Sequence, residues 1–371
     1  MKTKRTIKRN SRITAYLQKL YEVALNSEYK TDNDKYIALL TDVFQSNVIS
    51  YREIILVALV GREIDDTFRA NTNFYQCNPR GIYDQGPIKN FCIEKGFPHT
   101  KSGPLNIAKA SNINDEWATQ RDDKENAIRV VELIKLIDNG TTKLRNDLGV
   151  DLLRKYIAVA TYINQLTVSI EPSSDPIYLA NLCKTMIDSA PDSGNTPQRI
   201  VGYLLLSYHS AINSGVVVSG AEDSASATST TSNKPGDINE ELSDGTILKV
   251  YEITIKKFDL ARIIDSYDCV TKFNENFNCE IKEIIVICRN QDCPSEITKT
   301  DNKLFLGYYS YQDVIYYYLD IYEWISQLLV HMTSPARNSF YSRLNDYVNS
   351  TNTHESVKLA WNTLHKKESE K

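Results

Sequence analysis

Two acidic residues in the second half of the sequence have the types and the spacing of a metal site. Asp237 precedes a stretch of alternating polar and apolar residues, 246–256, in which Glu252 lies. The intervening Asp244-Gly245 pair is a strong hairpin signal, which predicts that the two acids return side by side on adjacent strands. Mg²⁺ prefers oxygen ligands, and once bound it neutralises charge and activates water for hydrolysis of a phosphodiester.

The predicted second strand carries further polar residues beside the acid. Period-two alternation places Glu252, Thr254 and Lys256 on one face, and the carbonyl group of Ile253 can add a metal ligand. Lys256 would position the attacking water and stabilise the transition state, with the Thr254 hydroxyl as an alternative. Without a metal, the same pattern describes a solvent-facing strand with a cross-strand ion pair worth under about 1 kcal/mol.

These residues resemble the PD-(D/E)XK nuclease motif, in which an aspartate is followed by acid-x-Lys on the next strand. Residues 230–238 (TTSNKPGDI) and 251–256 (YEITIK) are similar to segments of a group of bacterial type II restriction endonucleases, as are residues 103–109 (GPLNIAK) and 114–117 (NDEW). The sequence departs from the motif at one position. The lysine expected two residues after Glu252 is Thr254, and Lys256 comes two residues later.

The resemblance implies a Mg²⁺-dependent type II restriction endonuclease that cuts double-stranded DNA to 5′-phosphate and 3′-hydroxyl ends. It also implies a homodimer and a companion DNA methyltransferase that protects the host site. Two alternatives stay open at this point. One is a DNA-binding or partner-binding protein without catalysis, derived from a nuclease. The other is a nuclease of a different role, such as repair.

The elements around the acid pair predict an α-rich α/β fold. Residues 195–290 read helix, strand, strand, helix, strand, which builds a mixed sheet flanked by helices, as in restriction-endonuclease-like folds. We expect a mostly helical DNA-recognition region over 1–190 and the nuclease domain with C-terminal helices over 191–371. Spacings of three and four predict one long amphipathic helix over 311–332.

Several residues near the acid pair are candidates for DNA contacts. In the helix that begins near Pro197, Gln198 would lie near the metal and Arg199 near a phosphate, unless both are an ordinary polar first turn. Lys234 follows a stretch of Ser, Ala, Thr and Asn, 224–233, which we expect to become ordered on DNA; the alternative is a flexible linker.

A turn-rich block, residues 74–109, is the candidate for sequence recognition. It combines aromatic residues with basic ones that can read guanine edges or position the DNA backbone. The candidate contacts are Arg80, Lys89, His99, Lys101 and Lys109. The alternative is a structural loop whose basic residues are only solvated.

Composition and charge bear on which classes of protein the sequence can belong to. The longest apolar run has seven residues, 54–60, whereas a membrane-spanning helix needs about 20, so we expect no membrane association. Seven scattered cysteines without a CxxC pair indicate neither a disulfide framework nor a zinc site, as in a reduced cytoplasmic protein. The net charge is −4, yet residues 1–12 hold six Lys and Arg and no acid, which suits either an arm on phosphates or a solvated helix start.

Overall fold

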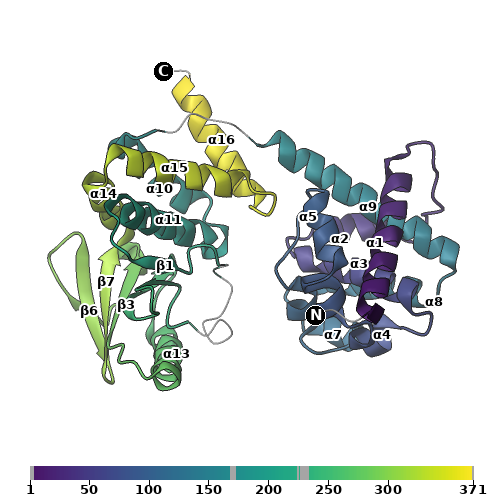
Figure 1. Cartoon of the computed structure of the whole chain (residues 1–371), viewed down its shortest axis with the longest axis horizontal. Coiled ribbons are helices and arrows are strands. Elements are labelled where there is room, and N and C mark those ends of the chain that lie inside the picture. The colour runs from purple at the N-terminus through teal and green to yellow at the C-terminus, as the bar shows by residue number, and fades with distance from the viewer. Residues whose placement is uncertain (1–3, 168–172, 224, 226–233, 370–371) are drawn as a thin grey trace. The chain divides into compact units, whose positions relative to one another are not determined.

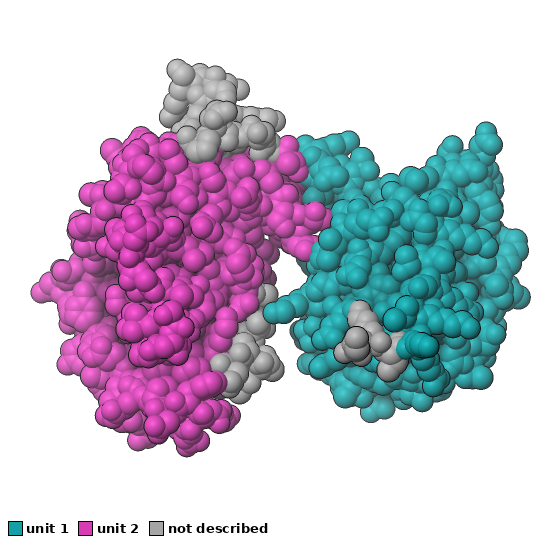
Figure 2. Space-filling view, in the orientation of Figure 1, with its two compact units in different colours: residues 1–165 teal, residues 166–371 magenta. Residues whose placement is uncertain are grey.

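The chain forms two compact units in a computed structural model that describes residues 4–167, 173–223, 225 and 234–369. The first unit spans residues 1–165 and the second 166–371 (Figure 2). We expected the boundary at residue 190. Helix α10 (Pro176–Ser189) instead belongs to the second unit, because its buried face joins the hydrophobic core of that unit through Leu182 and Met186.

The first unit is helical in its described part. Its central helix α3 (Ile49–Ile64) is buried over most of its surface, as its nearly continuous apolar sequence predicts. Helices α1, α8 and α9 pack against α3. The main helices of this unit are α1 (Lys4–Leu25), α2 (Ile37–Gln45), α3, α7 (Asp115–Thr119), α8 (Lys124–Asn139) and α9 (Thr142–Gln165).

The turn-rich block of this unit folds as short helices around a buried carboxylate. Glu53 of α3 is 1% exposed and accepts hydrogen bonds from the Thr100 N–H and the Thr100 hydroxyl, both at 2.6 Å, and from the Tyr83 hydroxyl. The short elements are α4 (Ala70–Asn73), η1 (Phe74–Cys77), the π-helical turn η2 (Arg80–Asp84), α5 (Pro87–Glu94) and α6 (Gly103–Ala108). The block is therefore held to the core by side-chain hydrogen bonds.

The second unit is built on a seven-stranded mixed sheet in the order β1-β2-β3-β4-β7-β6-β5. The β2–β3 hairpin is antiparallel, whereas β3, β4 and β7 run parallel. The strands are β1 (Val217–Ser219), β2 (Ile238–Glu241), β3 (Ile247–Thr254), β4 (Glu283–Cys288), β5 (Thr298–Lys299), β6 (Phe305–Tyr311) and β7 (Val314–Asp320). The expected α-rich α/β architecture is confirmed.

Helices cover both faces of this sheet (Figure 1). On one face, Ile238, Tyr251 and Ile287 pack in a core with α10, α11 and the C-terminal helices. On the other, Val250, Val286 and Tyr316 pack with α13 (Leu260–Phe277). The helices of the first face are α10, α11 (Asn195–Ile212), α14 (Ile321–His331), α15 (Ser334–Asn349) and α16 (Glu355–Ser369).

The helix predicted over 311–332 is wrong in its first half. Residues Val314–Asp320 form β7, which pairs with β4 and β6, and only Ile321–His331 is helical. The Asp320 carboxylate caps this helix by accepting from the N–H groups of Tyr322 at 2.9 Å and Glu323 at 3.1 Å. The tyrosines before it favour a strand once neighbouring strands are present to pack against.

Candidate functional site

The β2–β3 hairpin brings Asp237 and Glu252 to adjacent positions. Ile238 pairs with Tyr251, so Asp237, just before β2, and Glu252, just after Tyr251, lie opposite each other. The main-chain N–H of Ile253 donates a 3.0 Å hydrogen bond to Asp237 Oδ2. A side chain at Gly236 would place its Cβ 2.5 Å from Val250 Cγ1, so glycine allows the chain to bring Asp237 this close to β3.

The two carboxyl groups interact strongly because little water reaches them. Glu252 is 6% exposed, and its Oε1 accepts a 3.0 Å hydrogen bond from Ser266 Oγ. Burial, together with the negative charge of Asp237, raises the pKa of Glu252 well above its ordinary value. Burial also raises the pKa of Asp237, against the opposing effect of the Ile253 N–H and of Arg262. Two carboxyl groups this close are more stable with a proton or a cation between them than with both groups ionised and no cation present.

The oxygen atoms around this pair fit Mg²⁺. The N–H and C=O of one strand residue point to the same side, so the Ile253 carbonyl lies on the Asp237 side of β3. Mg²⁺ typically takes one or two protein carboxylates and fills its other positions with water and phosphate oxygens. Among the described residues no cluster of three His, Cys, Asp or Glu side chains is found, so a metal here would depend on the two carboxylates, the Ile253 carbonyl and water.

Thr254 and Lys256 do not lie as the predicted strand placed them. β3 ends at Thr254, and the exposed Lys256 follows in a bend rather than on the strand face. The Thr254 hydroxyl donates to the Lys256 carbonyl at 2.8 Å and accepts from the Lys256 N–H at 3.0 Å and from Arg262 Nη1. A hydroxyl has one proton and two lone pairs, so these three bonds occupy it fully and leave it no position for an attacking water.

The face that carries the acids is covered by α13, and this helix adds two side chains that the sequence did not single out. Arg262 and Ser266 are four residues apart and therefore lie on the same side of the helix. Arg262 donates to Thr254, and Ser266 donates to Glu252. The sequence contains the signals for this helix: the four-residue spacing of Arg262 and Ser266, and Asp259 as its N-cap. It does not indicate which face of the sheet the helix covers.

The helix expected to carry a residue near the metal packs on the opposite face of the sheet. In α11, Gln198 is buried and its Nε2 donates to the Gly220 carbonyl at 3.0 Å, while Arg199 binds the Ala221 carbonyl and the Glu222 side chain. Lys234 forms a 2.6 Å ion pair with Asp223. These three residues thus hold the segment before β2. Of the Ser/Thr stretch, residues 224 and 226–233 lie outside the described residues.

The candidates of the turn-rich block separate into exposed and anchored residues. Arg80, Lys101 and Lys109 are exposed. Lys89 Nζ donates to the Lys101 carbonyl at 3.0 Å, and His99 Nδ1 lies 2.9 Å from the Phe97 carbonyl oxygen. Burial lowers the pKa of His99. The first three are therefore available for phosphates or bases, and the other two support the fold of the block.

Charge is divided unevenly between the two units. Residues 1–165 contain 25 Lys and Arg against 20 Asp and Glu, a net charge of +5. Residues 166–371 contain 18 against 27, a net charge of −9. A polyanion is thus attracted to the first unit and repelled by the net charge of the second.

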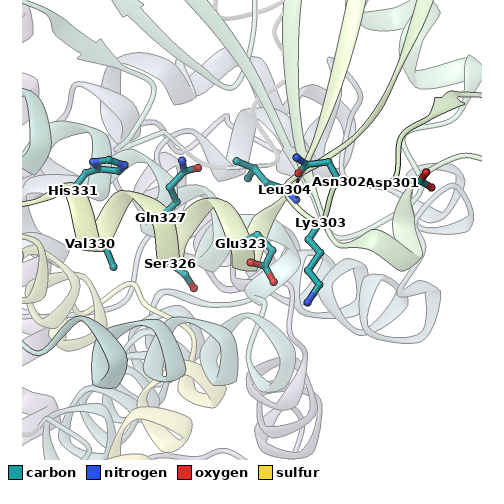
Figure 3. A pocket seen from close by; sticks show the side chains of 9 residues that line it. All are labelled: Asp301, Asn302, Lys303, Leu304, Glu323, Ser326, Gln327, Val330 and His331. Atoms are coloured by element: carbon teal, nitrogen blue, oxygen red, sulfur yellow. Dashed lines mark hydrogen bonds between the residues drawn. The ribbon is translucent and has the colours of Figure 1, made fainter.

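A pocket in the described surface has a lining that does not include the acid pair. It measures about 720 Å³ and lies between residues 301–304 and α14 (Figure 3). Asp301 comes from the loop and Glu323 from the helix, so its lining does not supply paired carboxylates on neighbouring strands. The acid pair is identified by its contacts and its electrostatics rather than by a cavity.

Comparison with known proteins adds nothing to this picture: no family model and no curated protein matches the chain. Among the described residues, no helix is both long enough and apolar enough to cross a membrane.

Proposed function

We propose that this protein is a magnesium-dependent nuclease of the PD-(D/E)XK type. More particularly, we propose a type II restriction endonuclease that hydrolyses double-stranded DNA at a specific sequence. The observation that carries the proposal is the juxtaposition of Asp237 and the buried Glu252 across the β2–β3 hairpin, with the Ile253 N–H fixing the first acid beside the second.

The chemistry follows from this donor set. Asp237, Glu252 and the Ile253 carbonyl would hold Mg²⁺, which supplies charge neutralisation and a more acidic bound water. In the hydrolysis the oxygen of a water forms a bond to phosphorus and the bond from phosphorus to the 3′ oxygen breaks. The attacking water loses one proton and the 3′ oxygen gains one, so the products are a 5′-phosphate and a 3′-hydroxyl.

The first unit would supply DNA recognition. Its net positive charge, together with the exposed Arg80, Lys101 and Lys109, supports contacts to phosphates and base edges. A homodimer suits this function, because a palindromic site has the two-fold symmetry of such a dimer. The companion would be a DNA methyltransferase that protects the same site.

Cleavage of unmethylated phage DNA by the purified full-length protein in Mg²⁺ tests the proposal. We expect discrete fragments from the wild type and a loss of roughly 100-fold or more for Asp237→Asn and Glu252→Gln. Binding of DNA in Ca²⁺, measured by gel shift, should persist in both variants. Asp244→Asn is a matched control, because Asp244 is an exposed acid in the turn of the same hairpin.

The alternatives give different results in the same experiment. A gel shift without cutting would support a binding protein derived from a nuclease. Cutting without discrete fragments would support a nuclease of another role. Wild-type cleavage rates in either acid variant would remove these residues from the site.

A further inference from the structure

The metal site of β3 has no lysine on its strand face. Thr254 occupies the position two residues after Glu252, and Lys256 lies beyond the end of the strand. Hydrolysis of a phosphodiester nevertheless builds negative charge on the phosphate oxygens, and a fixed cation aimed at that charge is a large contribution to catalysis. A cation near the acid pair must therefore come from another element.

Arg262 is the cation that the tertiary structure brings to this point. Its Nη1 donates to the Thr254 hydroxyl, and its guanidinium lies 4.8 Å from the centre of the Phe258 ring.

Two side-chain contacts between β3 and α13 fix the arrangement. Glu252 and Thr254 are two residues apart and share one face of β3, and Ser266 and Arg262 are four apart and share one face of α13. Ser266 contacts Glu252 and Arg262 contacts Thr254. Because these two contacts are neighbours on the same strand and the same helix, Arg262 is held on the same face of the sheet as the carboxylates.

We propose that Arg262, held by Thr254, replaces the strand lysine and binds the phosphate that is cut. This inference rests on the proposed nuclease function. A guanidinium has five N–H donors in a rigid fork that suits phosphate oxygens, and Thr254 takes one of them. Thr254 is then a positioning residue, and its full set of hydrogen bonds is the means by which it orients the arginine.

Single-turnover cleavage in Mg²⁺ by the full-length protein tests the proposal. We expect Arg262→Ala to lose roughly 100-fold or more in rate, with DNA binding in Ca²⁺ reduced by a much smaller factor. Arg262→Lys should recover part of the rate. Lys272→Ala, an exposed cation on the same helix, is the matched control and should cut like the wild type. Lys256→Ala should lose less than Arg262→Ala.

The pH profile separates a catalytic cation from a structural one. Arginine stays charged above pH 10, whereas lysine titrates near pH 10.4. Between pH 9 and 10.5, we expect the rate of Arg262→Lys relative to the wild type to fall as the lysine loses its proton. Arg262→Gln, which retains hydrogen-bond donors without the charge, should melt like the wild type and still cut slowly.

The outcomes distinguish this inference from the proposed function. If the wild type cuts and Asp237→Asn does not, but Arg262→Gln cuts within about threefold of the wild type, Arg262 is not the cation and the nuclease stands. If Lys256→Ala loses at least as much as Arg262→Ala, the inference is likewise overturned. If the wild type does not cut at all, the nuclease proposal itself fails.

Discussion

The main-chain N–H of Ile253 donates a 3.0 Å hydrogen bond to Asp237 Oδ2. This bond connects the first acid of the candidate site to the strand that carries the second, one residue beyond Glu252. A carboxylate fixed by the backbone cannot rotate away from its neighbour. The pair would therefore be preorganised for the cation that we propose, at the expense of electrostatic repulsion when both groups are charged.

Addition of a divalent cation should raise the melting temperature of the protein. The cation relieves the repulsion between Asp237 and Glu252 and binds only the folded chain. At ten times its dissociation constant it would add about 1.4 kcal/mol, which is about 3–6 °C for a unit of this size. Thermal denaturation with and without Mg²⁺ or Ca²⁺ measures this, with Glu252→Gln as the comparison. An equal shift in that variant would mean that the cation binds elsewhere.

The salt dependence of DNA binding should identify the phosphate contacts of the first unit. Each contact removed lowers the slope of log K against log salt by about 0.9. We expect Arg80→Ala, Lys101→Ala and Lys109→Ala to act in this way, because their side chains are exposed. Fluorescence anisotropy across a salt series measures the slope. Lys124→Ala, an exposed cation of α8, is the control, and an effect of equal size there would indicate general charge attraction only.

Thr100→Val should destabilise the first unit. The Thr100 hydroxyl donates to buried Glu53 and accepts from the Gly103 N–H at 2.7 Å. The substitution removes both hydrogen bonds and leaves the Glu53 carboxylate and the Gly103 N–H without this partner. Unmet polar groups of this kind reduce the free energy of unfolding by about 1–3 kcal/mol each. Urea denaturation measures the change. Thr119→Val, at an exposed helix end, should stay within about 0.5 kcal/mol of the wild type.

Lys358 should make the stability of the second unit depend on pH. Its side chain is fully buried, its Nζ donates to the Val348 carbonyl at 2.6 Å, and burial lowers its pKa from 10.5 to about 8. The folded state therefore releases this proton before the unfolded state does. The free energy of unfolding rises with pH between about 8 and 10.5, by up to about 3 kcal/mol, and the contribution is absent below pH 8.

Lys358→Met tests this assignment because it keeps a long side chain without the titrating group. Urea denaturation at pH 7.5, 9 and 10 should show a flatter profile for the variant than for the wild type. Identical profiles would show that Lys358 keeps an ordinary pKa in the folded protein.

Local sequence patterns are enough to specify several features of the site. The Asp-Gly turn and the period-two alternation specify the β2–β3 hairpin, and the apolar residues 284–288 (IIVIC) favour the buried strand β4, because these signals depend on residues close together in the chain. The antiparallel hairpin then brings 237 and 252 together without help from distant residues.

The surroundings of the two acids depend on packing between distant parts of the chain. Tyr316 and its neighbours fit a helical spacing as well as a strand, and pairing with β4 and β6 selects the strand. Likewise, α11 and α13 are both amphipathic, and the sequence of neither helix indicates which face of the sheet the helix covers. Long-range packing places α13 over the carboxylates, which brings Arg262 to the site, whereas Gln198 of α11 binds the Gly220 carbonyl. Such contacts join residues far apart in the chain, so local patterns do not encode them.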